Sequence, residues 1–292
     1  MVSALRKKET VFLAAALALL AAVLTYSFRP YGRRAKAEEN TYRLSSVITD
    51  IHIDTSVFDV SVIQSEDGIC TVTCRETDLL KHSVDLKSGV LTIVEEKREA
   101  SVNTSGLKLE IEVRLPELDR SSLTVRTDSG SIRAAAGLSF DYVKFESAGG
   151  SIYTELSVNN EMRCRTESGS LAMSGTSPAK VSAETVSGDI RAEDMRGTDM
   201  DLQTVSGKAE ISSAVVSGYL AVKTGSGDIS LQECDAQTVY LKSVSGDIKG
   251  SLLSGKNFSV KTVSGHIDVP GSSYGGSCEI VTTSGDAEIV IG

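Results

Sequence analysis

The sequence predicts an all-β chain whose larger part is a right-handed parallel β-solenoid of about nine coils. A Ser-Gly pattern recurs nine times from residue 130 onward, at steps of 19 or 20 residues. Apolar and polar residues alternate at fixed positions on both sides of each glycine, which is typical of strands with one buried face. A fixed period in this range indicates one supersecondary unit stacked on itself.

Each repeat is centred on a glycine that usually follows a serine and precedes a polar residue and then an apolar one, as in Val-Ser-Gly-Asp-Ile at 186–190. We expect a tight turn at this step, because glycine reaches positive φ without steric cost and serine bonds to nearby backbone. The predicted structural turn glycines are Gly130, Gly150, Gly169, Gly188, Gly207, Gly227, Gly246, Gly265 and Gly285.

Apolar columns lie seven and five residues before each glycine, and another lies two residues after it. Around Gly188 these positions hold Val181, Ala183 and Ile190. Each unit is therefore predicted to be a strand, a tight turn, a second strand and a looser turn. Identical columns favour solenoid coils over hairpins, because stacking places each column in register with itself. At about 4.8 Å per coil, nine coils would form a rod of roughly 43 Å, and right-handed winding is the default for parallel crossovers.

Two polar columns flank the turn. The position three residues before the glycine is Ser or Thr in all nine units, from Thr127 to Thr282. The side chains at this position are expected to point inward, which predicts a ladder of hydroxyl groups that hydrogen-bond to backbone groups at the corner. The inward direction argues against an ice-binding or glycan-binding function, which would need hydroxyl groups on an exposed face.

The position after the glycine is often Asp, as at Asp189, which raises calcium binding as an alternative to solvated turn residues. Ser, Lys and His interrupt this column and favour the turn interpretation.

We expect three regions: 1–37 with a membrane helix and linker, 38–120 as an irregular β cap, and 121–292 as the solenoid. Residues 107–115 alternate strictly and end at Pro116, which predicts a half-buried strand. Turns are expected at Asp67-Gly68 and Ser88-Gly89. Further strands are predicted at 47–53, 57–63, 69–74 and 90–94.

Residues Val11 to Phe28 form an uncharged run of 18 residues. As a helix it would be about 27 Å long, near the minimum for spanning a bilayer. The favoured interpretation is an uncleaved anchor, and the alternative is a signal peptide cleaved after 35–37. Basic residues flank both ends of the run, so orientation is not fixed by charge alone. We expect a single-pass cell membrane protein with the solenoid outside the membrane.

From residue 38 onward the chain has 23 basic and 38 acidic residues, a formal balance of −15. This charge argues against nucleic acid as a partner. At the other end, Val290 and Ile291 follow directly on the last repeat. We therefore expect an uncapped C-terminal coil whose free backbone groups favour contact with a partner or self-association with a second copy.

No catalytic, cofactor-binding or metal-binding residues are predicted. Cys164 and Cys278 fall in apolar columns, and Cys70 and Cys74 lie about 13 Å apart along one predicted strand. A cross-link from either of the last two to Cys234 stays open. The three histidines, His52, His82 and His266, do not lie at the spacing of a metal motif. The chain has no Trp and 5% aromatic residues, too few for the stacking platforms of sugar-processing clefts, and no coil departs from 19 or 20 residues to build a cleft.

The repeats resemble a known family. Leu115-Pro116, then Val125-x-Thr127-x-Ser129-Gly130-Ser131-Ile132, then repeated Thr-Val-Ser-Gly-Asp-Ile, are similar to bacterial β-strand-repeat domains described as putative adhesins of unknown function. The resemblance covers roughly residues 45 to 292. It implies a non-catalytic domain that often follows an N-terminal membrane helix and supplies no catalytic residues. Departures are the 148–150 Ala-Gly-Gly coil and the 207–209 Gly-Lys-Ala coil.

The function predicted is that of a membrane-anchored, non-catalytic β-solenoid at the bacterial cell surface, serving as an adhesin or envelope scaffold. The alternative is a regulatory module that passes an envelope-stress signal to membrane partners. An enzyme acting on cell-wall glycans is a weaker third possibility, because the coils lack cleft-forming insertions.

Overall fold

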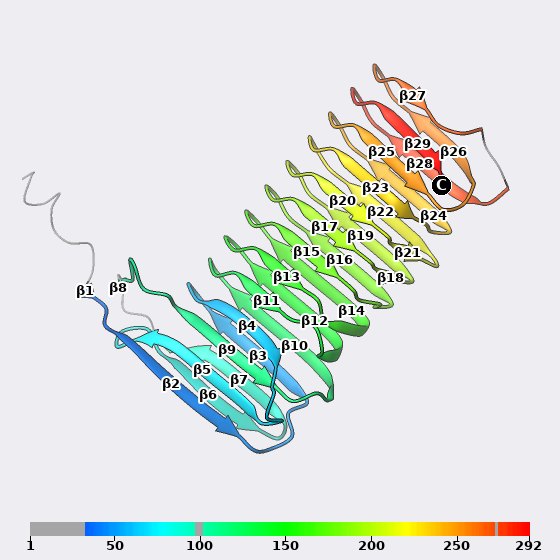
Figure 1. Ribbon diagram of the computed structural model, residues 1–292. Coiled ribbons are helices and arrows are strands. Elements are labelled where there is room, and N and C mark those ends of the chain that lie inside the picture. Colours follow the sequence, from blue (N-terminus) through cyan, green and yellow to red (C-terminus); the bar gives the residue numbers. More distant parts are fainter. Residues whose placement is uncertain (1–32, 97–101, 272–273) are drawn as a thin grey trace, which may run out of the picture.

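The computed structural model describes residues 33–96, 102–271 and 274–292, and Figure 1 shows them as a long stack of strands. Across these three ranges, no helix is long and apolar enough to cross a bilayer. The predicted anchor at Val11 to Phe28 lies outside the described residues. The predicted all-β class is confirmed.

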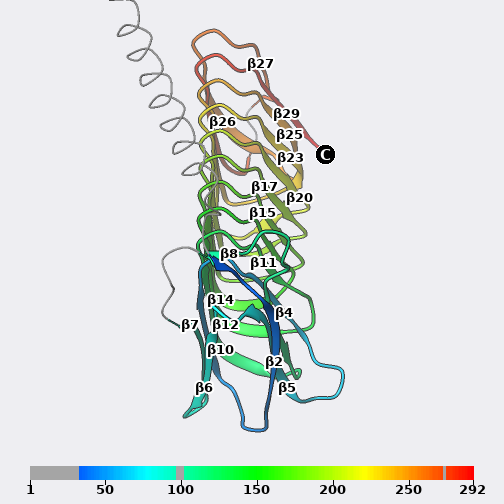
Figure 2. The ribbon, with the colours of Figure 1, turned by 90° about the vertical axis from the view of Figure 1, so that its left-hand side faces the viewer.

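Two long sheets of 13 and 12 strands, mostly parallel, face each other along the whole stack (Figure 2). Each coil contributes one strand to each sheet. For example, β16 (Lys180–Glu184) lies in the 12-stranded sheet and β17 (Ile190–Glu193) in the 13-stranded sheet. Residue Val181 of β16 pairs with Met200 one repeat later, so each column stacks on itself as the period predicts.

The coils that follow residue 118 supply both sheets and a short third one. In the 12-stranded sheet they give β10 (Asp119–Thr127), β12 (Ser139–Ser147), β14 (Ser157–Thr166), β16, β19 (Asp199–Gln203), β22 (Tyr219–Lys223), β24 (Thr238–Lys242), β26 (Lys256–Lys261) and β28 (Gly276–Val281). In the 13-stranded sheet they give β11 (Ile132–Ala134), β13 (Ile152–Thr154), β15 (Leu171–Ser174), β17, β20 (Ala209–Ser212), β23 (Ile229–Cys234), β25 (Ile248–Leu252), β27 (Ile267–Asp268) and β29 (Ala287–Ile291). The third sheet pairs β18 (Arg196–Gly197) with β21 (Val215–Val216).

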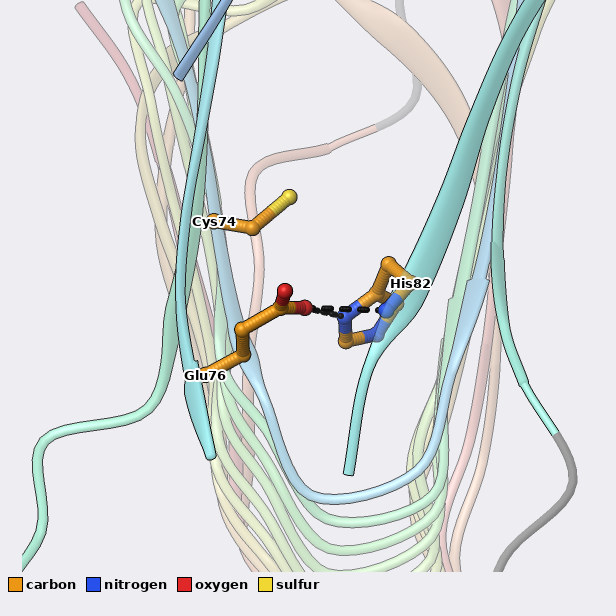
Figure 3. A group of neighbouring side chains, drawn as sticks. All are labelled: Cys74, Glu76 and His82. Atoms are coloured by element: carbon orange, nitrogen blue, oxygen red, sulfur yellow. Dashed lines mark hydrogen bonds and ion pairs between the residues drawn. The ribbon is translucent and has the colours of Figure 1, made fainter. Parts of the chain in front are cut away.

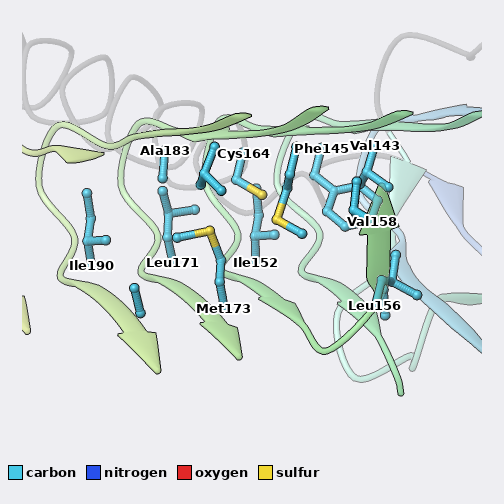
Figure 4. Close-up of a cluster of buried hydrophobic side chains, with 14 of the residues drawn as sticks. Val143, Phe145, Ile152, Leu156, Val158, Cys164, Leu171, Met173, Ala183 and Ile190 are labelled. Atoms are coloured by element: carbon cyan, nitrogen blue, oxygen red, sulfur yellow. The ribbon is translucent and has the colours of Figure 1, made fainter. Parts of the chain in front are cut away.

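The core lies between the two sheets and is built from the predicted apolar columns. Figure 4 shows Phe145, Cys164 and Ala183 of one sheet facing Leu171 and Ile190 of the other. All five are at most 1% exposed. Each large aliphatic side chain buried in this way contributes about 1.5–3 kcal/mol to the free energy of folding. The fold is therefore stabilised by buried side chains spread along the whole stack rather than by one central cluster.

The stack begins inside the region predicted as a cap. Strands β3 (Asp50–Thr55) and β4 (Asp59–Gln64) form a coil that pairs directly with β10 and β11. On its other side lie β7 (Val90–Glu95) and β9 (Glu110–Leu115), followed by antiparallel β5 (Cys70–Thr77) and β6 (His82–Lys87). Strand β2 (Ala37–Leu44) adds to β5, and β1 (Arg33–Arg34) pairs with β8 (Val102–Asn103). The predicted strands near β3, β4, β5, β7 and β9 are confirmed, whereas β2 and β6 were not expected.

The C-terminal coil is not at the end of the stack. Strand β28 pairs with β24 on one side and β26 on the other, and β29 lies likewise between β25 and β27. Figure 1 shows these last strands, in red, inside the orange pair β26 and β27. The expectation of an uncapped C-terminal coil is therefore wrong, because the chain skips one level, forms the end coil 256–268, and returns to fill the gap.

A buried lysine holds the connection that skips a level. Lys256 is 2% exposed, and its Nζ donates to Asp235 Oδ1 and, at 2.7 Å, to Ser254 Oγ. Ser254 Oγ also donates to Asp235 at 3.0 Å. Burial alone would raise the pKa of Asp235, but these hydrogen bonds and the lysine charge lower it overall. The buried ammonium group thus has both a charged partner and a hydroxyl partner, as a buried charge requires.

Candidate functional site

The nine predicted turn glycines stack at one corner of the coils. A Cβ built on Gly188 would lie 1.8 Å from the carbonyl oxygen of Gly169, and one on Gly150 would lie 1.9 Å from that of Gly130. None of the nine lies among the glycines with positive φ. The reason expected from sequence was thus wrong: glycine is needed because backbones of successive coils approach too closely for a side chain.

The Ser/Thr column forms the hydroxyl ladder that its inward parity predicts. Thr204 Oγ1 donates to the carbonyl of Gly188 at 2.9 Å and accepts the N–H of Gly207 at 3.1 Å. Ser243 repeats both bonds with Gly227 and Gly246. From Thr127 to Ser243, each ladder hydroxyl therefore satisfies one donor in its own coil and one acceptor in the preceding coil. Thr262 and Thr282 each accept the N–H of the glycine three residues later.

Replacing Thr204 by valine is expected to lower the free energy of unfolding by about 2–4 kcal/mol, because a buried N–H and a buried carbonyl both lose their partner. Urea unfolding followed by circular dichroism measures the loss. The serine variant at the same position is the matched control and keeps most of the stability, since Ser243 makes the same bonds. Equal stability of the valine and serine variants would show that the ladder is unimportant.

The aspartates after the glycines join successive coils. Asp189 Oδ1 accepts the N–H of Lys208 at 2.8 Å, and Asp228 and Asp247 do the same for the next coils in the stack. The N–H of Asp286, followed by the Lys249 side chain, lowers the pKa of Asp247. The carboxylates thus act as corner caps, which is the turn role preferred over calcium binding.

A buried polar cluster closes the hydroxyl ladder at the N-terminal end. Thr55 occupies the ladder position of the first coil, as its pairing with Thr127 shows. Its Oγ1 lies 2.9 Å from His82 Nε2, and His82 Nδ1 lies 3.1 Å from Glu76 Oε2. Because a carboxylate accepts, His82 Nδ1 donates to Glu76, and Nε2 forms its bond with the Thr55 hydroxyl. Asn40 Nδ2 donates to the other carboxylate oxygen at 2.7 Å.

Cys74 completes this cluster. Figure 3 shows Cys74 and Glu76 pointing from β5 toward His82 on β6. Ligand atoms of the three residues lie within 4.8 Å of one another, and all three residues are buried. Thr55, His82 and Glu76 have the order of a nucleophile, base and acid, but Thr55 is only 4% exposed and His82 3%. A substrate would have no access to the hydroxyl.

Burial and the neighbouring groups set the ionisation of the cluster. Burial, and next the charge of Glu76, raise the pKa of Cys74 to about 12, so the thiol is protonated. Burial would raise the pKa of Glu76 too, but hydrogen bonds from His82 and Asn40 lower it overall. The cluster therefore holds a charged carboxylate supported by hydrogen-bond donors.

Sequence reasoning missed this cluster because its members are not spaced as a motif. Cys74 and Glu76 lie on one face of a strand, and His82 comes from the next strand across the interior. The available signal was parity: Cys70, Val72 and Cys74 alternate inward, and Glu76 continues that inward series. An acidic residue at a buried position needs a partner. The other two histidines take no part in it.

All five cysteines are free and buried. Cys164 and Cys278 occupy core columns as predicted. Cys70 and Cys74 are free thiols, so neither is cross-linked to Cys234. Cys234 lies on β23, near the opposite end of the stack from β5.

The outer faces carry open hollows between charged side chains. One on the 12-stranded sheet is lined by Lys144, Glu161, Arg163 and Glu184 among others. Lys144 Nζ lies 2.8 Å from Glu146, and Arg163 lies 2.8 Å from Glu161. These charges neutralise one another locally, so the face presents no single-sign field.

The end coil presents apolar residues at the open end of both sheets. Val263 is 82% exposed and Ile267 43% exposed. Strands β26 and β27 each have one sheet neighbour among the described strands. Edge strands of this kind can pair with another chain.

Two solved structures share the fold at low sequence identity. One, described as a "putative adhesin" from Bacteroides fragilis, has a TM-score of 0.54 and 17% identity, and the match covers 75% of this chain and 100% of the other. Another, described as a "putative lipid binding protein" from Parabacteroides distasonis, has a TM-score of 0.53 and 17% identity, with 88% of this chain and 99% of the other covered. A search of the curated proteins found no match.

The family resemblance seen in the repeats is confirmed over nearly the whole described stack. A family model matches residues 48–232 and again 214–291. The match begins just before the first coil and ends with β29, so it spans the coils described above. The chain belongs to the Toastrack DUF4097 family.

Proposed function

We propose that the chain is a membrane-anchored, non-catalytic β-solenoid that presents a binding surface outside the bacterial cell membrane, as an adhesin or envelope scaffold. In this proposal Val11 to Phe28 form the anchor, and the coils wind in the right-handed sense that parallel crossovers favour.

The main support is a constant core beneath a variable surface. Two residues after each glycine the side chain is apolar, and in every coil except the end coil it is buried, as at Ile152 and Ile190. The next position points outward and changes from coil to coil, with Tyr153, Ala172 and Arg191 in successive coils. Stacked repeats of this kind offer an extended surface whose chemistry can vary without disturbing the fold.

Shared fold gives further, weaker support. One structural neighbour is described as an adhesin candidate and another as a lipid-binding candidate. Both descriptions concern contact with other molecules rather than catalysis. At 17% identity the likeness concerns the fold, so it favours a contact role without naming a ligand.

The alternative is a regulatory module that docks on membrane partners, and the end coil 256–268 is the feature that favours it. Its edge strands and exposed Val263 offer a place for strand addition. Self-association with a second copy, first expected at the C-terminal coil, is proposed at this end coil instead.

One experiment separates these proposals. Val263→Cys introduces an exposed thiol, whereas the five native thiols are buried and make the wild type a matched control. In intact cells, a membrane-impermeant maleimide that carries a photo-cross-linker is expected to label only the variant. Illumination is then expected to capture wall polymer or another surface component.

Each other result has a defined meaning. Labelling only after permeabilisation would contradict the extracytoplasmic placement. Exclusive capture of a membrane kinase or transporter would favour the regulatory alternative over adhesion. Capture of a second copy of the chain would support self-association at the end coil, and its absence at high expression would argue against it.

A further inference from the structure

The buried cluster at the N-terminal end brings together three kinds of metal ligand. Cys74 and Glu76 come from β5 of one sheet and His82 from β6 of the other, with ligand atoms within 4.8 Å of one another. We propose that Cys74, Glu76 and His82 bind a divalent transition-metal ion, and that zinc is the ion their chemistry fits best.

The ligand types and the charge balance point to zinc. Thiolate, imidazole and carboxylate are the protein ligands that zinc takes, commonly in tetrahedral geometry, and three of them leave a fourth position for water. Metal binding would release the proton of the Cys74 thiol. The resulting thiolate and the Glu76 carboxylate then balance the two charges of the ion, so the buried cluster becomes neutral overall. Calcium and magnesium prefer oxygen ligands alone and fit this set poorly.

The spacing already approaches that of a bound metal. His82 Nδ1 and Glu76 Oε2 lie 3.1 Å apart. Two ligands bound at about 2.0–2.1 Å with tetrahedral angles lie about 3.3 Å apart. An ion would take the place of the proton that Nδ1 donates to Glu76, with a small outward movement of these two side chains, and metal binding releases displaced protons to solvent.

The surrounding residues are placed to support such a site. When Nδ1 binds a metal, the other ring nitrogen carries the proton and donates it to an oxygen. Thr55 Oγ1 lies 2.9 Å from His82 Nε2 and can accept that bond, while its own proton turns toward Glu95 Oε2 at 3.4 Å. Asn40 holds the second carboxylate oxygen of Glu76 at 2.7 Å.

The position of the cluster indicates a structural role for the metal. It lies where the two sheets end, and its ligands join one sheet to the other through β5 and β6. A metal bound only in the folded state stabilises that state by mass action. The ion would thus tie the two sheets together at the end of the stack formed by β2, β5 and β6.

The test measures metal in the purified full-length chain, kept reduced and loaded with zinc before removal of free ion. About one zinc per chain is expected by elemental analysis. Cys74→Ser and His82→Gln are expected to lose it. Cys70→Ser is the matched control, because Cys70 is buried on the same strand and lies outside the cluster, and it is expected to keep the metal.

Two further measurements keep the proposal testable even where a variant fails to fold. Cobalt-loaded wild type is expected to show a thiolate-to-cobalt absorption band in the near ultraviolet, and zinc is expected to raise its thermal midpoint relative to chelator-treated protein. Wild type that retains no zinc and shows neither effect would overturn the proposal and leave the cluster a hydrogen-bonded Glu–His pair. Metal retained equally in Cys74→Ser, His82→Gln and Cys70→Ser would also overturn it.

Discussion

Gly150→Ala is expected to prevent formation of a stable stack, whereas Gly149→Ala leaves it folded. A Cβ on Gly150 would lie 1.9 Å from the carbonyl oxygen of Gly130, but one on Gly149 would meet nothing nearer than 3.4 Å. The obstructing atom is backbone in the neighbouring coil, so no side chain can turn aside. The coils would have to separate, which also breaks the bonds between Ser147 and both glycines at 130 and 150.

We expect the Gly150 variant to lose about 4 kcal/mol or more of unfolding free energy, the range reserved for severe single replacements. The Gly149 variant should stay within about 1 kcal/mol of wild type. Urea unfolding monitored by far-ultraviolet circular dichroism compares the two neighbours under one set of conditions. Similar midpoints for both variants would show that coil spacing at this corner is not fixed by the missing side chain.

The sequence predicts what recurs at every coil. The columns around Gly188, with Val181, Ala183 and Ile190, are buried as expected because a side-chain period of two leaves only one face to fill the core. The hydroxyl column was placed correctly for the same reason. The sequence did not reveal why glycine is required at the corner. Positive φ is the more familiar reason for a repeated turn glycine. The actual reason, close approach of two coils, depends on backbone atoms of residues about 19 positions apart.

Features that occur once escaped prediction. Glu76 and His82 meet through strands in different sheets, and no repeated column marks either residue. Phe58 stands at the glycine position of the first coil, where Gly130 packs against its carbonyl. This coil was therefore assigned to the cap, although Thr55 and Asp59 keep the ladder and corner positions.

The order of the last coils escaped prediction for a different reason. Coils 256–268 and 276–291 carry the same columns, so either can stack on β24 and β25 with similar burial. Local pattern then cannot distinguish sequential stacking from the observed exchange. In the observed order, the first residue of the end coil, Lys256, reaches back across the skipped level and binds Asp235.

Disulfide trapping is expected to report the exchanged order directly. Tyr240 of β24 pairs with Glu279 of β28, and Ser259 of β26 pairs with Glu279 from the other side. Cysteines at 240 and 279 should therefore cross-link almost completely on mild oxidation, because neighbouring strands lie about 4.8 Å apart. Cysteines at 240 and 259 are two spacings apart, about 9.6 Å, which exceeds the reach of about 7 Å for a disulfide.

Cysteines at 259 and 279 provide the matched positive control, because these positions are neighbours in both the exchanged and the sequential order. The five native thiols are buried and stay outside the reaction. Mass spectrometry of the non-reduced monomer identifies each bond. Efficient cross-linking of 240 with 259, together with failure of 240 with 279, would mean that the coils stack in chain order. The pair of results cannot agree with both arrangements, since only one coil can occupy the level directly against β24.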